Sequence, residues 1–322
     1  MKTLVATLLL FFAALPALAA PSAWEREWPD TDFAKHAVPL EEIMSGGVPK
    51  DGIPSIDDPS FAAAAEIEDL GPREPVIRLE AAGEVRAYPL RILTWHEIVN
   101  DEVGGIPVAV TYCPLCNAAI VFDRRLDGQT LEFGTTGKLR KSDLVMYDRQ
   151  TESWWQQFLG EAIVGEMTGA RLEMLPSRIE SWESFRAAHP DAPVLVPNDA
   201  GLRDYGRNPY AYYDTAANPF LYRGALPEGI PPMAYVVAVD GEAWSLELLR
   251  QQGRIEQGDL VLSWSEGAAS ALDAPRISEG REIGNVVVQR RSADGGLEDV
   301  VYDLTFAFVF HAFRPEGTIH KE

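Results

Sequence analysis

The chain of 322 residues carries 49 acidic and 28 basic side chains, which gives a formal net charge of −21. Nucleic acid is a polyanion that proteins bind mainly through Lys and Arg, so this balance argues against a nucleic-acid partner and against an anionic membrane surface. Hydrophobic residues make up 46% of the chain, enough for a large core, and at this length we expect the core to divide into two sub-domains.

The first residues have the pattern of a secretory signal peptide. Lys2 is followed by the apolar run Leu4–Leu15 and then by the small-residue triplet Ala17-Leu18-Ala19. A spanning helix needs about 20 apolar residues, and no cysteine follows the cleavage site to carry a lipid, so we expect no stable membrane anchor. We predict a signal peptide over residues 1–19, cleavage near Ala19 and a periplasmic or secreted mature protein.

Residues 20–70 carry regularly spaced prolines and a Gly-Gly pair. Because proline blocks both helices and interior strands, we predict an irregular N-terminal segment that lies over the body of the protein.

Residues 71–200 are predicted to form a first β-rich repeat. Leu90–Val99 has apolar residues at helical spacing and predicts a helix, and Ser181–His189 predicts a second one that ends before a proline. Runs rich in β-branched and aromatic residues, bounded by Gly, Pro or Asp, predict strands. These strands are Val76–Glu80, Glu84–Tyr88, Ile106–Tyr112, Ala118–Asp123 and Thr130–Phe133.

Residues 201–233 form a Tyr-rich connecting loop, and residues 234–322 then repeat the first pattern. Three segments match later ones at similar offsets: Gly83-Glu84 with Gly241-Glu242, Val108–Tyr112 with Leu260–Trp264, and Asp143–Asp148 with Glu298–Asp303. We therefore predict a mainly β (α+β) chain, with two β-rich sub-domains from an internal duplication, few short helices and long irregular segments.

The second copy lacks the candidate metal ligands and titratable side chains of the first copy. In this alignment Ser265 replaces Cys113, Ala268 replaces Cys116, Val301 replaces Met146, and the position of His96 falls near Gln251. A repeat that is built without these residues does not need them for packing. The first copy is therefore expected to carry the function.

Cys113 and Cys116 are the only cysteines, and they stand together in Cys-Pro-Leu-Cys-Asn. In an exported chain such a pair is either a redox couple or two ligands of a soft metal ion. A thioredoxin-type site opens a long helix, whereas the residues after Cys116 predict a strand. The pattern therefore favours a turn that presents two thiolates to one metal.

Our leading hypothesis is a copper site. Cys113 and Cys116 would be ligands, completed by His96 and Met146, because soft sulfur donors favour Cu(I). Zinc is possible, but with no second cysteine pair it would need His96 and a carboxylate, or a partner chain. A periplasmic metal-exchange partner would then receive or deliver the ion.

Two alternatives stay open, and so does the question of whether the protein is an enzyme. In a thiol–disulfide oxidoreductase Cys113 would attack, Cys116 would resolve and His96 would move protons, with a thiol-exchange partner. In a ligand-binding protein the cysteines would form a structural disulfide beside a cleft. The candidate cleft residues are Tyr88, Asp148, Trp154, Gln156, Tyr205 and Tyr210.

The chain resembles the bacterial and archaeal family labelled domain of unknown function 3179, over about residues 70–315. The motifs that carry the resemblance are Ala87–Asn100, Val110–Cys116, Ser142–Asp148, Thr151–Trp154, Gln156, Gly160, Gly165, Trp182, Arg203–Tyr210 and Phe306–Phe313. The family has no established activity, so the resemblance implies signature positions and no reaction. Those positions are Tyr88, His96, Cys113, Cys116, Met146 and Asp148. Asn117 departs from the family pattern, which more often has glycine there.

Overall fold

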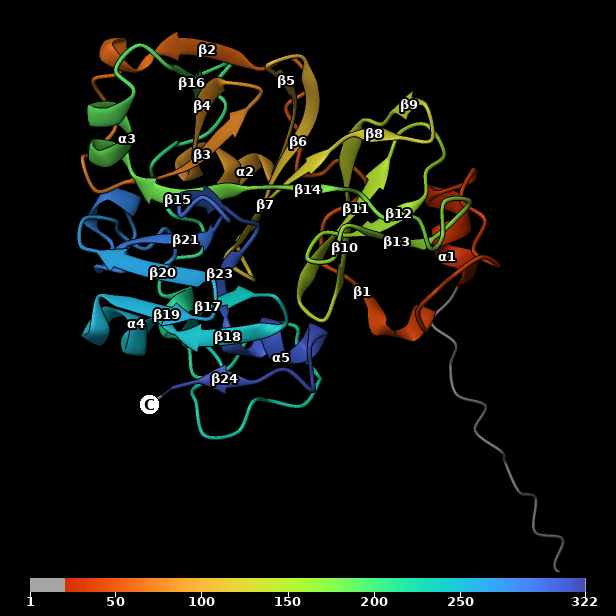
Figure 1. Ribbon diagram of the computed structural model, residues 1–322. Helices are drawn as coiled ribbons and strands as arrows, with labels where there is room; N and C mark the ends of the chain where they lie inside the picture. The colour runs from red at the N-terminus through yellow and green to blue at the C-terminus, as the bar shows by residue number, and fades with distance from the viewer. Residues whose placement is uncertain (1–20, 322) are drawn as a thin grey trace, which may run out of the picture.

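The structure is a computed structural model that describes residues 21–321 (Figure 1). The predicted signal peptide lies outside this range. Strands hold 40% of the chain and helices 15%, which confirms the predicted β-rich class. No helix among the described residues is long and apolar enough to span a membrane.

The predicted division into two β-rich sub-domains is wrong. Besides one short two-stranded hairpin, the strands form five small sheets that stand in a propeller-like ring (Figure 1). One apolar core runs through these sheets and takes buried side chains from Ile56 near the N-terminus to Phe313 near the C-terminus. Each sheet is too small to bury an apolar face alone, so the two halves of the chain share one core.

Two sheets belong to the first half of the chain. Sheet I contains, in spatial order, β15 (Ser177–Ser181), β3 (Pro75–Ala81), β4 (Glu84–Pro89), β16 (Pro193–Val196) and β2 (Ser60–Ala63). Sheet II contains β14 (Met174–Leu175), β7 (Ala118–Asp123), β6 (Ile106–Cys113) and β5 (Ile98–Val103). Helices α2 (Leu90–His96) and α3 (Trp182–Ala188) follow β4 and β15.

Sheet III stands beside sheet II and contains β1 (Ile43–Ser45), β10 (Phe133–Arg140), β11 (Asp143–Asp148), β12 (Trp154–Gln156) and β13 (Glu161–Val164). The hairpin β8 (Arg125–Leu126) and β9 (Gln129–Thr130) precedes it, and helix α1 (Pro21–Glu27) packs against its outer side (Figure 1).

The second half forms the other two sheets. Sheet IV contains β23 (Asp303–Phe306), β17 (Tyr235–Val239), β18 (Glu242–Ser245) and β24 (Ile319–His320). Sheet V contains β19 (Arg254–Gln257), β20 (Leu260–Ser265), β21 (Asn285–Arg291) and β22 (Leu297–Asp299). Helices α4 (Leu246–Gln252) and α5 (Ala307–Phe313) follow β18 and β23.

Apart from the edge strand β2, sheets I and II have the same topology as sheets IV and V. In both halves a hairpin leads through a short helix into a three-stranded meander, and a later strand pairs in parallel with the second hairpin strand: β16 with β4, and β24 with β18. Sheet III interrupts the first half between β7 and β14, where the second half has only the turn Ser292–Gly296.

This topology corrects one of the three sequence matches. Asp143–Asp148 forms β11 of the inserted sheet, whereas Glu298–Asp303 joins β22 to β23, the counterparts of β14 and β15. The two segments are similar in amino-acid composition but do not occupy equivalent positions in the fold. Met146 therefore has no counterpart at Val301.

Two predicted elements also have different bounds. The predicted helix Leu90–Val99 stops at His96, because Glu97 adopts φ 59° and the β-branched Ile98 and Val99 enter β5. The predicted strand Thr130–Phe133 is split between β9 and β10. The other four predicted strands are confirmed, and so is α3, which Ser181 caps through its side chain.

Candidate functional site

The two cysteines lie in the turn between β6 and β7. The Cys116 N–H donates to the Cys113 carbonyl over 3.1 Å, and Asn117 closes the turn in the left-handed region with φ 50°. The Asn117 side chain accepts from the Tyr112 hydroxyl at 3.0 Å and donates to the Leu304 carbonyl of β23 at 2.8 Å. The cysteine turn is thereby fixed to the second half of the chain.

The inserted sheet brings a carboxyl group to the cysteine turn. Lys141 and Ser142 form the two-residue connection between β10 and β11, and both have positive φ, 56° and 66°. Such turns usually contain Asn or Gly, so this hairpin is held in place by tertiary contacts. The Ser142 hydroxyl donates to the Phe220 carbonyl at 2.5 Å, and the Lys141 ammonium donates to the Ala312 carbonyl at 2.7 Å. Asp143 follows directly.

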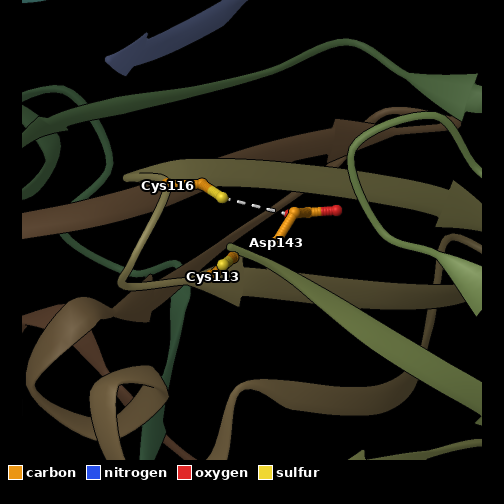
Figure 2. Close-up of side chains that lie close together, drawn as sticks. All are labelled: Cys113, Cys116 and Asp143. Atoms are coloured by element: carbon orange, nitrogen blue, oxygen red, sulfur yellow. Dashed lines mark hydrogen bonds between the residues drawn. The ribbon is translucent and has the colours of Figure 1, made fainter. Parts of the chain in front are cut away.

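Cys113, Cys116 and Asp143 bring their donor atoms within 4.8 Å of one another (Figure 2). The Cys116 thiol donates to Asp143 Oδ1 over 3.3 Å, and all three side chains are buried. The other carboxylate oxygen, Oδ2, accepts from Gln156 Nε2 at 2.5 Å and from the Phe158 N–H at 3.0 Å. Asp143 is therefore oriented with one oxygen toward the sulfur atoms.

Burial dominates the protonation of this cluster. It raises the pKa of Asp143 to about 6, against the hydrogen bonds from Phe158 and Gln156. Burial also raises the pKa of the Cys113 thiol, and that of Cys116 lies well above its ordinary value. Two such thiols are protonated at neutral pH and are poor nucleophiles unless a cation stabilises their thiolates.

A second buried carboxyl group, Glu97, follows α2 near the cysteine turn but is not one of the donors that lie within 4.8 Å of one another. Glu97 is 7% exposed, and its backbone carbonyl accepts from the Tyr112 N–H at 2.8 Å, one residue before Cys113. Burial and the charge of Asp143 raise the pKa of Glu97 to about 8, although a hydrogen bond from Tyr210 opposes this shift.

The predicted ligands His96 and Met146 lie in other contacts. His96 Nδ1 lies 2.8 Å from the Pro54 carbonyl and therefore donates to it, which leaves Nε2 to accept from the Tyr205 hydroxyl at 2.8 Å. Met146 is fully buried in the main apolar core. Neither belongs to the cluster around the thiols, and their role as metal ligands stays a prediction.

The residues predicted to line a ligand cleft divide into two groups. Gln156 contacts the site by donating to Asp143, and Tyr210 lies near Glu97. The others are bonded elsewhere. Tyr88 donates to Asp101 at 2.6 Å, Asp148 accepts from Thr151 and Trp155, Trp154 packs in a separate apolar cluster, and Tyr205 bonds His96.

Sequence reasoning missed Asp143 and Glu97, although both stand in motifs quoted for the family resemblance. Asp143 is the first residue of a strand in which only Met146 and Asp148 were predicted to be site residues. Glu97 had a clearer signal. The corresponding residue of the second half is Gly253, with φ 69° against φ 59° for Glu97, so a glutamate stands where this backbone favours glycine.

Two thiols and one carboxyl group form a donor set for a borderline-soft dication. Zn²⁺ accepts Cys sulfur and Asp or Glu oxygen in tetrahedral sites. The cluster is built from two parts of the chain: the turn between β6 and β7 of sheet II and the hairpin between β10 and β11 of sheet III.

The chain belongs to the family described as protein of unknown function (DUF3179), whose model matches residues 50–317. This confirms the resemblance found in the sequence. Among curated proteins and solved structures, none matches the chain.

Proposed function

We propose that this member of the DUF3179 family binds one Zn²⁺ ion through Cys113, Cys116 and Asp143. The observation that carries the proposal is the convergence of two sulfur atoms and one carboxylate oxygen within 4.8 Å in a buried site. Each group resists ionisation by itself, because burial raises its pKa. A bound dication would stabilise all three anions together.

The carboxylate favours zinc over copper. Two thiolates and a carboxylate carry three negative charges, which a dication offsets better than Cu(I) does. Carboxylate oxygen is also a hard donor that Cu(I) does not prefer, whereas zinc accepts it beside sulfur. In the copper site expected from the sequence, His96 and Met146 would complete the shell around the two thiolates, but both lie in other contacts.

The geometry supports a redox role less well. A thiol–disulfide oxidoreductase needs one accessible sulfur of lowered pKa. Here Cys113 is 2% exposed, Cys116 is fully buried, and both pKa values are raised. The two cysteines are free thiols in the structure rather than a structural disulfide.

The proposed setting is the periplasm or the exterior of the cell, supported by the signal-peptide pattern of the sequence. A buried ion that is exchanged there would pass to or from a partner protein. Export and partner are both open to direct measurement by fractionation of the cells and by capture with the metal-loaded protein.

Native mass spectrometry of the protein, isolated without chelator or reductant, tests the proposal. We expect a mass increase of one zinc per chain that is absent in Cys113→Ser and Cys116→Ser. A mass increase of one copper would contradict zinc and identify Cu(I) as the bound ion. A metal-free mass lower by two hydrogens would show a disulfide and contradict the proposal.

A further inference from the structure

A cavity of about 610 Å³ lies in the second half of the chain, and none of its lining residues belongs to the cysteine cluster. Three parts of the chain form most of its wall: the connecting loop with the start of β17, the first turn of α4, and the residues that lead into β21. Cavities of about 300–1,000 Å³ are the usual size of small-molecule sites.

A network of hydrogen bonds fixes the buried side of this cavity. Asp214, whose side chain is fully buried, accepts from the Tyr235 hydroxyl at 3.1 Å and from the Ser270 hydroxyl at 2.6 Å. Arg281 Nη2 donates to the same carboxylate oxygen at 3.0 Å. These bonds tie the connecting loop to β17 and to the β20–β21 connection, so the protein holds the cavity in shape by itself.

In the first half, an ion pair occupies the matching position. The Glu74 carbonyl accepts from the first residue of α3 at 2.8 Å, and the Ala234 carbonyl accepts from the first residue of α5 at 2.8 Å, so the two residues correspond. Arg91 and Glu247 correspond as the second residues of α2 and α4. Arg91 forms an ion pair with Glu74, which is 1% exposed. The second half has alanine in place of this buried carboxylate, which leaves room for the cavity.

The three acidic residues of the wall already have donors. Asp214 is bonded as described above. Glu282 Oε2 accepts from the Arg73 guanidinium at 3.2 Å, and Glu247, exposed on α4, accepts from Gln251 Nε2 at 2.9 Å.

Two basic residues of the wall have no acidic partner. Among residues 21–321, no carboxylate oxygen lies within 4.0 Å of a side-chain nitrogen of Arg250 or Lys321. The Arg250 guanidinium lies 5.5 Å from the centre of the Trp264 ring, and Lys321 Nζ donates to the Gly229 carbonyl at 3.1 Å. An anion in the cavity would supply the missing charge partner, because a guanidinium and an ammonium both bond acidic groups strongly.

We propose that this cavity binds a small organic acid. Its apolar body would pack on the buried side chains Met233, Leu246 and Ile283, and its acidic group would bind Arg250 and Lys321. The proposal does not depend on the zinc site. It gives a binding role to the half of the chain that the sequence predicted to be without function.

Two fluorescent dyes that differ by one charged group test the proposal in the full protein. Anilinonaphthalene sulfonate combines apolar rings with an anionic group, and phenylnaphthylamine has the same rings without that group. We expect wild type to bind one sulfonate dye per chain, and to bind the neutral dye roughly 10-fold more weakly.

Substitutions on the wall separate the charge from the cavity. Arg250→Gln and Lys321→Gln should each weaken binding of the sulfonate dye by roughly 10-fold and leave the neutral dye unaffected. Arg223→Gln, at an exposed position of the connecting loop outside the wall, is the control and should behave as wild type. The double variant Ala234→Glu with Glu247→Arg gives the second half the ion pair of the first half, and it should bind neither dye.

Thermal melting checks that each variant is folded. The proposal is overturned if wild type shows no saturable binding, if it binds the two dyes equally, or if Arg250→Gln and Lys321→Gln both keep wild-type affinity. These two single variants decide the outcome even if the double variant does not fold. Cys113→Ser should bind both dyes as wild type does, so a failure here is distinguishable from a failure of the proposed zinc site.

Discussion

The cysteine turn of the first half and the matching turn of the second half share one backbone frame, and only the first carries the thiol site. Cys113 ends β6 and is 2% exposed, whereas Ser265 ends β20 and is exposed. The backbone pairing is the same: Ile98 pairs with Thr111, and Arg254 pairs with Ser263. The two turns differ in what covers them.

The covering parts are those that break the repeat. Sheet III is inserted only in the first half and supplies Asp143 and Gln156. The β20–β21 connection is longer, residues 266–284, so Ala268 has no position equivalent to that of Cys116. The comparison teaches that the frame folds without thiols, and that the site arises where an insertion meets the frame.

The largest effect is expected from the cysteines themselves. Cys113→Ser places in the first half the residue that the second half already has, so the variant should fold and should lose zinc affinity by more than roughly 100-fold. Ser265→Cys is the matched control and should gain no affinity, because no carboxyl group of an inserted sheet faces it. Chelator competition measures both. Equal affinity of Cys113→Ser and wild type would break the comparison.

The pH dependence of stability should change sign with the ion. The pKa of Asp143 is raised from 3.8 to about 6, and that of Glu97 from 4.5 to about 8. The folded protein therefore holds protons that the unfolded chain has already released. Their contribution to stability is full below pH 4 and is lost as pH rises to 8, by about 3 kcal/mol for Asp143 alone.

Urea unfolding in chelator, at pH 5 and pH 8, checks this contribution through Asp143→Asn. The variant should gain stability relative to wild type as pH rises. With zinc the trend should reverse, because protons compete with the ion for the same donors. If the free energies of unfolding of wild type and Asp143→Asn differ by the same amount at pH 5 and pH 8, the raised pKa of Asp143 is contradicted.

A smaller effect is expected at the contact that ties the cysteine turn to the second half. Asn117→Ala removes the bonds to Tyr112 and Leu304 and leaves a strained backbone, so we expect a loss of about 2–3 kcal/mol in the free energy of unfolding. Asn117→Gly relieves the strain and should lose about 1 kcal/mol less. Equal losses in the two variants would show that the left-handed conformation costs nothing here.

The smallest effect is expected at Met146. It is fully buried and pairs with Thr135 and Trp155 in sheet III, which has no counterpart in the second half. Met146→Leu should cost less than about 1.5 kcal/mol and should leave zinc affinity unchanged. A large loss of affinity would restore Met146 as a ligand.

The sequence was sufficient to predict the local structure around the two cysteines. Strand patterns predicted β6 and β7, and the Cys-x-x-Cys turn between them follows from their bounds. The helix at Leu90 was predicted too long, because its end depends on the left-handed backbone of Glu97 rather than on apolar spacing. The glycine at the matching position, Gly253, indicates a left-handed backbone there and so marks where the helix ends.

Contacts between residues far apart in the chain could not be predicted from the pattern of apolar and polar residues. Asp143 reaches the thiols only because an inserted sheet packs beside sheet II, and strand composition does not show which sheet a strand joins. The same limit produced the false match of Asp143–Asp148 with Glu298–Asp303. Chain length predicted two sub-domains, whereas small sheets in a ring share one core.

X-ray absorption at the zinc edge of the loaded protein counts the sulfur and oxygen donors around the ion and so tests whether Cys113, Cys116 and Asp143 bind it. We expect two sulfur atoms at about 2.3 Å and oxygen donors at about 2.0–2.2 Å, with one sulfur lost in Cys113→Ser. A shell of nitrogen and oxygen alone, or one with the multiple-scattering pattern of histidine, would contradict this expectation.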